Sequence, residues 1–197
     1  MKTKYLIGIV FLLVGIYLSI FQFESHFYTF FSIGLFLIFL EYYNSSNKNK
    51  LFKKWNDKQF ILFSILLIVF SVITDRIGLF LNYWEYQYLT LFDEILKYIF
   101  EWGIALLYIM IFFMIGINIF EKKFSKKLSL ILSLLIFVTL IGFFTEFINS
   151  FSYSWKILSM PLTNYKIGNY FIVFQTIGYW IMAIVSFTMY KFINKLK

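Results

Sequence analysis

The residues best suited to chemistry in this chain are three carboxylates at the edges of long apolar segments. Asp75 ends one apolar run, Glu146 ends another, and Glu101 lies within the apolar stretch 99–104. Burial among apolar side chains disfavours the charged form of a carboxyl group, because the ion loses its hydration. A carboxyl group that keeps its proton near neutral pH can act as a general acid. Asp75, Glu101 and Glu146 are therefore predicted as catalytic residues.

Tryptophans accompany these acids. Trp84 and Trp155 each follow an acid by nine residues, and Trp102 directly follows the third acid. The segments 76–96 and 148–167 around the first two are long for helix–helix connections. One interpretation is an aromatic belt at a lipid–water interface, where Trp and Tyr are common. The other is a lid or re-entrant segment over a cavity, in which case the three tryptophans bind substrate.

Two amides are the remaining candidates for substrate binding. Asn149 follows Glu146 by three residues and shares its face if the helix continues that far. Gln175 lies near the start of the last apolar segment. The alternative is that these amides form hydrogen bonds between helices.

The composition excludes several kinds of site. The chain has no cysteine and one histidine, which rules out disulfides, thiolate metal sites and a multi-histidine metal site within one chain. Phosphate-binding loops, nucleophile elbows, zinc-protease motifs and dinucleotide fingerprints are absent from the sequence. We therefore predict neither a metal nor a cofactor.

Hydropathy predicts one polytopic domain of the all-α membrane class over residues 1–197. Hydrophobic residues make up 61% of the chain and charged residues only 14%, an excess of apolar surface that lipid can solvate but a small soluble core cannot hide. A span needs about 20 mostly apolar residues. The predicted spans are 4–22, 27–43, 59–75, 97–119, 128–147 and 168–190.

Lysines predict the orientation of these spans. Most of them fall at the two termini and in the segments 44–58 and 121–127, which alternate with segments that contain few. Cytoplasmic loops are enriched in Lys and Arg. We therefore predict a multi-pass protein of the cell membrane with both termini in the cytoplasm. The net charge of +8 is explained by this topology and by contact with the lipid bilayer, without a nucleic-acid partner.

An internal repeat is predicted from an offset of 71 residues. At this offset Asp75 aligns with Glu146 and Trp84 with Trp155. With a short insertion, Glu101 aligns with Gln175. Each unit would be a helix with an acid at its outer end, a long outer segment with a tryptophan, and a returning helix. The two units would be related by an axis along the membrane normal.

The segments 75–77, Trp84–Tyr86 and 99–102 together resemble the lycopene-cyclase domain family of carotenoid biosynthesis. The resemblance covers about residues 59–119, with a fainter echo over 128–190. The family pattern is an acid at a helix end, a Trp-x-aromatic segment, and a proline-containing double-acid motif that opens the next helix. This chain has Ile99 at the position of the proline and Trp102 at that of the second acid.

The resemblance implies a small membrane protein built from repeated helical hairpins, with Glu101 as the counterpart of the first motif glutamate. It implies an isomerase reaction on a hydrophobic, isoprenoid-like substrate. A carboxylic acid protonates a polyene end group, a carbocation forms, and a ring closes with loss of a proton. Aromatic faces would stabilise the cation, since the ring quadrupole attracts positive charge.

Two other functions stay open on the sequence alone. A small-molecule-binding or transport subunit would have a pocket open to water outside. A structural protein without catalysis would pair its acids with Lys97, Arg76 and Lys156 and leave no cavity; Lys97 lies one helical turn before Glu101. The sequence does not decide between a monomer, a homo-oligomer and a hetero-oligomer.

Overall fold

The protein is helical in the computed structural model, which describes residues 2–22, 27–86, 90–152, 154–159, 166–167, 170–171 and 174–196. In chain order the helical segments are α1 (Lys2–Gln22), α2 (Phe27–Ser46), α3 (Asp57–Phe80), α4 (Leu91–Leu96), η1 (Lys97–Trp102), α5 (Gly103–Phe120), α6 (Lys126–Leu132), η2 (Ser133–Val138), α7 (Thr139–Ser152), η3 (Phe174–Gly178) and α8 (Tyr179–Ile193). The segments marked η are π-helical turns. They join α4 to α5, join α6 to α7, and precede α8.

Six of the resulting helices are long and apolar enough to cross a membrane, counted over the described residues. They are Thr3–Gln22, Phe27–Ser46, Asp57–Phe80, Asp93–Phe120, Lys126–Ser152 and Thr176–Ile193. Each of these helices overlaps one of the six spans predicted from hydropathy. The all-α assignment is therefore confirmed for the helical core, and no membrane is present in the structure.

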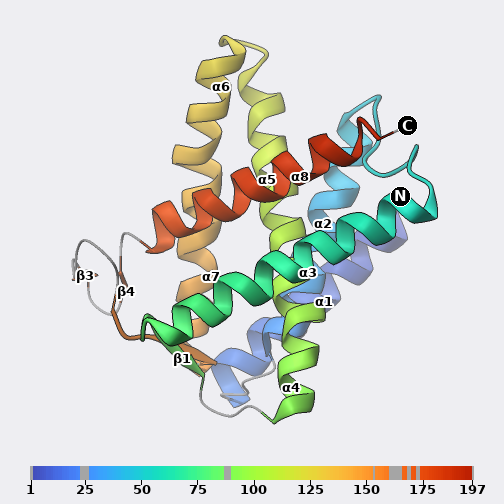
Figure 1. Ribbon diagram of the computed structural model, residues 1–197. Helices are drawn as coiled ribbons and strands as arrows, with labels where there is room; N and C mark the ends of the chain where they lie inside the picture. Colours follow the sequence, from blue (N-terminus) through green and yellow to red (C-terminus); the bar gives the residue numbers. More distant parts are fainter. Residues whose placement is uncertain are drawn as a thin grey trace.

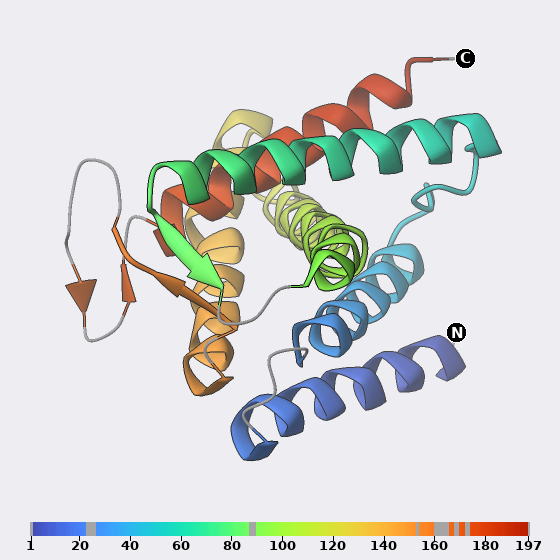
Figure 2. The ribbon, with the colours of Figure 1, turned by 60° about the horizontal axis from the view of Figure 1, so that its bottom comes forward.

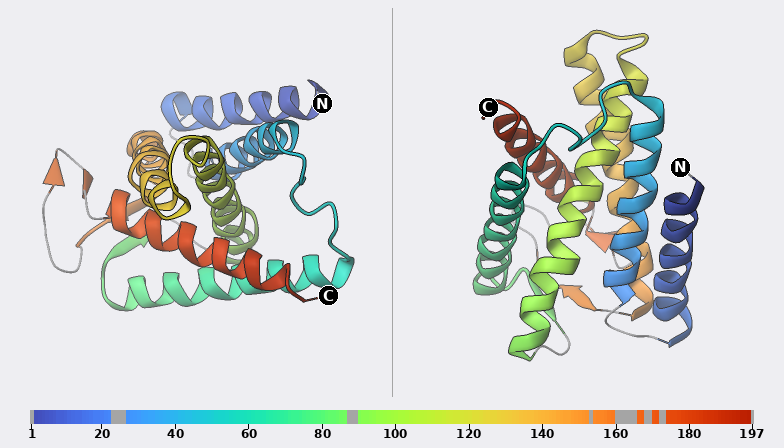
Figure 3. Two further views of the ribbon diagram at one scale, coloured as in Figure 1. Left: turned by 90° about the horizontal axis from the view of Figure 1, so that it is seen from above. Right: turned by 90° about the vertical axis from the view of Figure 1, so that its right-hand side faces the viewer.

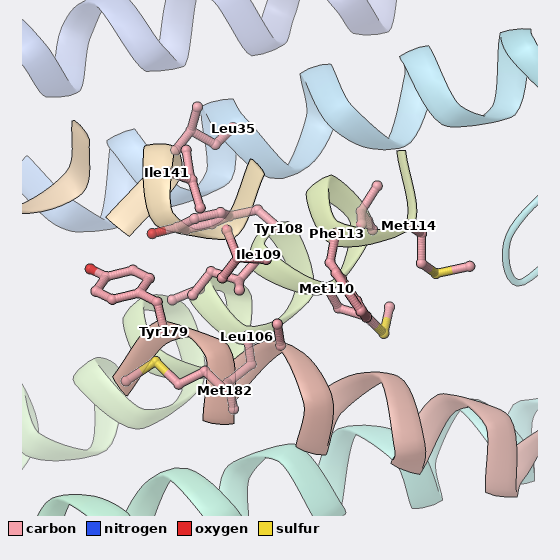
Figure 4. Close-up of a cluster of buried hydrophobic side chains, with 14 of the residues drawn as sticks. Leu35, Leu106, Tyr108, Ile109, Met110, Phe113, Met114, Ile141, Tyr179 and Met182 are labelled. Carbon is pink, nitrogen blue, oxygen red and sulfur yellow. The ribbon is translucent and has the colours of Figure 1, made fainter. Parts of the chain in front are cut away.

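Helix α5 is the central element. It contacts α2, α3, α8 and the α6–α7 helix, and Figure 2 shows it surrounded by the other helices. Most of its side chains are buried, including Leu106, Ile109 and Phe113. These side chains form the middle of an apolar cluster with residues of α2, α7 and α8, part of which is drawn in Figure 4. The residues around α5 are thereby fixed in one packing arrangement.

The loops gather at two opposite ends of the molecule. The chain termini and the lysine-rich connections 47–56 and 121–125 lie at one end, here called the lysine end (Figures 1 and 3). The other end, here called the strand end, carries α4 and the strands β1 (Trp84–Tyr86), β2 (Trp155–Ile157), β3 (Lys166–Ile167) and β4 (Tyr170–Phe171). This arrangement matches the alternation of lysine-rich and lysine-poor segments in the sequence.

Helix α3 extends beyond the span predicted from the sequence. The predicted span ended at Asp75, whereas the helix continues to Phe80 and keeps Asp75 fully buried. Asn82 then adopts a left-handed conformation with φ of 55°. The Asn82 amide donates to the Leu79 carbonyl and the Tyr83 amide to the Gly78 carbonyl, which is the hydrogen-bond pattern of a Schellman cap. The cap turns the chain directly into β1.

The last predicted span begins too early. The prediction placed its start at residue 168, but residues 166–167 and 170–171 pair as the antiparallel strands β3 and β4, and the helix starts at η3. The residues around 170 are aromatic and β-branched, and such residues suit a strand as well as an apolar helix. An apolar run alone therefore cannot locate this helix start.

Helices α1 and α2 approach each other closely at glycines. A Cβ atom on Gly34 would lie 2.5 Å from the Leu12 backbone nitrogen, and one on Gly15 would lie 2.6 Å from the Phe31 nitrogen. Small residues allow such backbone contact between helices in membranes. A larger side chain at Gly34 would collide with the backbone of α1. Backbone atoms, unlike the end of a flexible side chain, cannot move aside.

We expect Gly34→Val to destabilise the protein by about 1–3 kcal/mol, the usual range for overpacking. The measurement is denaturant unfolding in detergent micelles. Val14→Leu adds volume beside Gly15 on the exposed face of α1 and serves as the control, with unchanged stability expected. Equal stability of Gly34→Val and the control would contradict the close contact.

Candidate functional site: an aromatic cavity with two carboxyl groups

A two-stranded antiparallel ribbon roofs the strand end of the helices. Strands β1 and β2 pair so that Trp84 lies opposite Ile157 and Tyr86 opposite Trp155. Alternate side chains of a strand point to opposite faces. All four of these residues line a cavity beneath the ribbon, and the two strands lie side by side in Figure 2.

The outer face of the ribbon is polar. Glu85 and Lys156 lie opposite each other between the inward-facing residues, and their side chains are 54% and 61% exposed. The segments predicted as lids or as an aromatic belt thus contain a short ribbon with one aromatic face and one charged face. These strands were not predicted from the sequence.

Below the ribbon lies a cavity with about 40 Å³ of free space. Its walls come from α2, η1, α5, α7 and α8 as well as the ribbon, and they are aromatic except for the carboxyl groups of Glu101 and Glu146 and a few aliphatic side chains. The lining residues are Tyr28, Trp84, Tyr86, Glu101, Trp102, Ala105, Ile109, Glu146, Trp155, Ile157, Tyr179 and Met182. The cavity has room for about two or three water molecules.

The structure therefore brings most of the predicted site residues to one place. Glu101, Glu146 and the three tryptophans Trp84, Trp102 and Trp155 all line the cavity, although they come from η1, α7 and the two strands. The pairing of β1 with β2 brings these residues together although they are far apart in sequence.

Asp75 lies behind the cavity wall, at the centre of a hydrogen-bond network. Its Oδ1 accepts from Trp84 Nε1 at 3.1 Å and from the Tyr86 hydroxyl at 2.5 Å. Its Oδ2 accepts from Lys97 Nζ at 3.0 Å and from the Tyr98 hydroxyl at 2.7 Å. Four donors, one of them the Lys97 cation, satisfy a buried carboxylate, which would otherwise be costly. Asp75 thus anchors two cavity-lining side chains.

Lys97 completes this network from the first position of η1. Its side chain is only 2% exposed, and its Nζ lies 3.7 Å from the centre of the Tyr86 ring. Burial raises the pKa of the Tyr86 phenol well above its usual value, and the Asp75 charge adds to this effect. Tyr86 therefore stays a donor to Asp75 at neutral pH. Tyr86 also accepts from Trp102 Nε1 at 3.2 Å, which extends the network to another residue of the cavity lining.

Gly78 provides the space for one of these side chains. A Cβ atom on Gly78 would lie 1.9 Å from Cζ2 of Trp84, so the indole ring packs directly against the glycine. The ring sits between Gly78, Asp75 and Trp102, with ring centres of the two tryptophans 6.3 Å apart. Gly78, three residues after Asp75, thus leaves the space that the Trp84 ring occupies in the cavity wall.

Glu146 is buried in the opposite wall, with 5% of its surface exposed. Its carboxyl oxygens accept from Trp155 Nε1 at 3.2 and 3.3 Å, and Oε1 accepts from the Tyr179 hydroxyl at 3.1 Å. Among the residues that the structure describes, no lysine or arginine forms an ion pair with it. Burying an unpaired carboxylate costs far more than burying a carboxylic acid. This site is suited to a group that holds and releases a proton.

Glu101 lies in the π-helical turn η1 and is partly exposed. The Thr29 hydroxyl of α2 donates to its Oε1 at 3.1 Å. π-helical turns recur at functional sites because the extra residue redirects neighbouring side chains. The turn lets Lys97 reach Asp75 while Glu101 and Trp102 face the cavity.

The predictions that Asn149 and Gln175 bind substrate have different outcomes. Asn149 is 5% exposed and donates from Nδ2 to the Trp155 carbonyl at 2.9 Å, so it holds the start of β2 against α7. Gln175 belongs to η3, but its side chain lies outside the described part of the structure. Its predicted contact with substrate therefore remains a prediction.

Several lining residues were not predicted from the sequence. Tyr28, Tyr179 and Met182 come from apolar helix faces that carry no distinguishing pattern. Tyr86 could have been found, because it follows Trp84 by two residues and therefore shares its face in a strand.

The three cations predicted to pair with acids in a structural protein all do so, but with acids other than Glu101 and Glu146. Arg76 pairs with Glu94 at 2.6 Å, Lys156 lies 3.8 Å from Glu85, and Lys97 is bonded to Asp75. The expectation that Lys97 pairs with Glu101 was wrong, because the turn at η1 directs Lys97 toward α3. The expectation that pairing leaves no cavity was also wrong.

Comparisons of the chain with protein-family models, curated proteins and solved structures found no match. The class that the fold defines is a helical protein with six helices of membrane-spanning length and apolarity. Any assignment of its activity depends on the cavity itself.

Lys97→Met leaves Asp75 buried without its cation, and we expect it to cost about 3–5 kcal/mol of stability. Asp75→Asn together with Lys97→Met removes both charges and should recover most of this loss. The measurement is denaturant unfolding in detergent micelles.

The matched control is Lys156→Met, which breaks an exposed ion pair and should cost less than about 1 kcal/mol. If the double variant were as unstable as Lys97→Met alone, the buried pair would not be the source of the stability.

Proposed function

We propose that this chain is a polytopic membrane enzyme that isomerises a polyene or another isoprenoid hydrocarbon by proton transfer, in the manner of a lycopene cyclase. The observation that carries the proposal is the cavity itself, in which two carboxyl groups from different helices face a lining of Trp and Tyr rings. The resemblance of the segments 75–77, Trp84–Tyr86 and 99–102 to the lycopene-cyclase family supports the same chemistry.

Glu146 is the proposed acid. It is buried among neutral donors, so its protonated form is the less costly one to bury. Its O–H bond breaks as a C–H bond forms at one end of a substrate double bond. The cation then formed is attacked by a neighbouring double bond, which closes a ring. The rings of Trp155, Trp84 and Trp102 line this space, where their faces would stabilise positive charge.

Glu101 is the proposed base. It is the more exposed of the two cavity carboxyl groups and accepts a hydrogen bond from Thr29. It would take a proton from the carbon next to the cationic centre, so that a new double bond forms. Atoms and electrons balance without an oxidant, a reductant or a cofactor. In this scheme Asp75 positions Trp84 and Tyr86 and does not itself transfer a proton.

The cavity must enlarge when a substrate binds. The free space of about 40 Å³ holds a few water molecules and is smaller than a polyene end group. Met182 at the α8 wall is a flexible side chain that can move aside.

We also propose that the chain is a multi-pass membrane protein and that it contains an internal repeat. Six helices of sufficient length and apolarity support a multi-pass protein, and the lysine end would face the cytoplasm. The internal repeat is supported by two pairs of equivalent contacts: Trp84 bonds Asp75 and Trp155 bonds Glu146, each across nine residues. The paired strands that carry these tryptophans are also at equivalent positions.

Expression in a bacterial host that accumulates lycopene tests the activity. We expect a cyclised, blue-shifted product by chromatography and absorbance. Glu146→Gln and Glu101→Gln should each lower its yield by about 100-fold or more, the usual contribution of general acid–base catalysis. Glu85→Gln changes an acid on the outer face of the same ribbon and should leave the yield unchanged.

Unchanged lycopene, with the wild-type chain present in the membrane, would contradict cyclisation of this substrate. It would favour the alternative that the cavity binds a small molecule without converting it. Equal activity of Glu146→Gln and wild type would exclude Glu146 as the acid.

Single-cysteine labelling tests the orientation, since the natural chain has no cysteine. We expect a membrane-impermeant maleimide to label Glu85→Cys in intact cells and Lys123→Cys only after lysis. The two positions lie at the strand end and the lysine end, respectively. The reverse pattern would invert the proposed topology, and labelling of both in intact cells would contradict it.

A further inference from the structure

A chain of buried hydroxyl groups connects Glu146 to Tyr28, which also lines the cavity. The Tyr28 and Tyr108 hydroxyls are 2.9 Å apart, and the Tyr108 hydroxyl is 3.2 Å from Thr145 Oγ1. Thr145 also hydrogen-bonds the Tyr179 phenol. Tyr179 in turn donates to Glu146 Oε1 at 3.1 Å.

The chain crosses the whole helical core. Tyr28 belongs to α2, Tyr108 to α5, Thr145 and Glu146 to α7, and Tyr179 to α8. All five side chains are at most 7% exposed, and Tyr108 and Thr145 are fully buried. Figure 4 shows the hydroxyls of Tyr108 and Tyr179 pointing the same way, out of the apolar cluster that surrounds their rings.

Such hydroxyls are not required for packing. Phenylalanine would fill the position of Tyr108 without a polar group, and a buried hydroxyl without a partner is costly. A hydroxyl can both donate and accept a hydrogen bond, so a proton can enter at one end of the chain as another leaves at the other. The orientation at Tyr179 fits delivery to Glu146, because Tyr179 is the donor and the carboxylate is the acceptor.

The proposed reaction requires a path that returns a proton to Glu146. After one turnover Glu146 has lost its proton and Glu101 has gained one, so the two groups must be reset before the next substrate reacts. Thr29, which donates to Glu101, is the neighbour of Tyr28 on α2, and both Tyr28 and Glu101 line the cavity. The relay therefore begins at a lining residue next to the hydrogen-bond partner of Glu101 and ends at Glu146.

We infer that Tyr28, Tyr108, Thr145 and Tyr179 form a proton-return relay that resets Glu146 between turnovers. This inference rests on the proposed function. The proton of Glu101 passes to the Tyr28 oxygen, directly or through one water in the cavity. Each hydroxyl then gives its own proton to the next, and Tyr179 protonates the Glu146 carboxylate. No bond to carbon changes and no electron is transferred in this step.

The test separates the first turnover from later ones, using the full-length protein in detergent micelles with lycopene as the probe. In Tyr108→Phe, Glu146 starts protonated, so the first turnover should keep the wild-type rate. Later turnovers should slow by roughly tenfold or more, because a relay group is missing. The expected signature is a burst of one product per chain followed by a slow phase.

Two further variants exclude a purely structural effect. Thr145→Val should give the same burst, and Thr145→Ser, which keeps the hydroxyl, should restore steady turnover. Tyr43→Phe makes the same chemical change at a buried position of α2 outside the relay and should behave as wild type. A general loss of packing would slow the first and later turnovers together.

The outcomes distinguish the relay from the function on which it rests. A wild-type protein that leaves lycopene unchanged would overturn the proposed function, and the relay with it. An active wild type with steady, undiminished turnover in Tyr108→Phe would overturn the relay alone and leave Glu146 and Glu101 in their roles. Equal slowing of first and later turnovers in Tyr108→Phe and in Thr145→Val, with Thr145→Ser no better than Thr145→Val, would also overturn it.

Discussion

The strand end of this protein depends on the burial of one ionised carboxylate. Asp75 can remain fully buried only because Lys97 and three neutral donors surround it, and each donor is thereby held in one place. Trp84 and Tyr86 belong to β1, Tyr98 and Lys97 to η1. The carboxylate thus joins α3, the ribbon and the start of the central helix. The position of the ribbon over the cavity follows from that joint, since three-residue strands have little stability of their own.

The local sequence explains how these groups reach Asp75. The Schellman cap at Asn82 reverses the chain so that Trp84 folds back onto Gly78 and the acid. A capping box between Thr90 and Asp93 starts the next helix. The π-helical turn at Lys97 then directs its ammonium group toward α3 and Glu101 toward the cavity. Each device is local, and together they place side chains from distant segments around one point.

Sequence reasoning could predict the helices and the acids, but not the surface that joins them. Apolar runs long enough to span a membrane locate all six helices, because lipid-facing and buried positions are both apolar there. Asp75, Glu101 and Glu146 stand out because acids are rare in such runs. The ribbon gives no comparable signal, since three residues cannot establish a period. Tyr28 and Tyr179 could not be selected among 15 tyrosines without knowing which helices meet.

The two acids that precede tryptophans by nine residues differ in one respect that decides their chemistry. Both accept the indole N–H, but only Asp75 also binds a buried lysine. An adjacent cation stabilises the charged form of a carboxyl group, whereas neutral hydroxyl and indole donors allow the proton to stay or leave. Glu146 has the Tyr179 hydroxyl where Asp75 has a cation, and on this difference we base the proposed roles of Asp75 as an anchor and Glu146 as an acid. In the proposed relay, the Tyr179 hydroxyl that donates to Glu146 is also the group that returns its proton, because Tyr179 continues into the hydroxyl chain through Thr145.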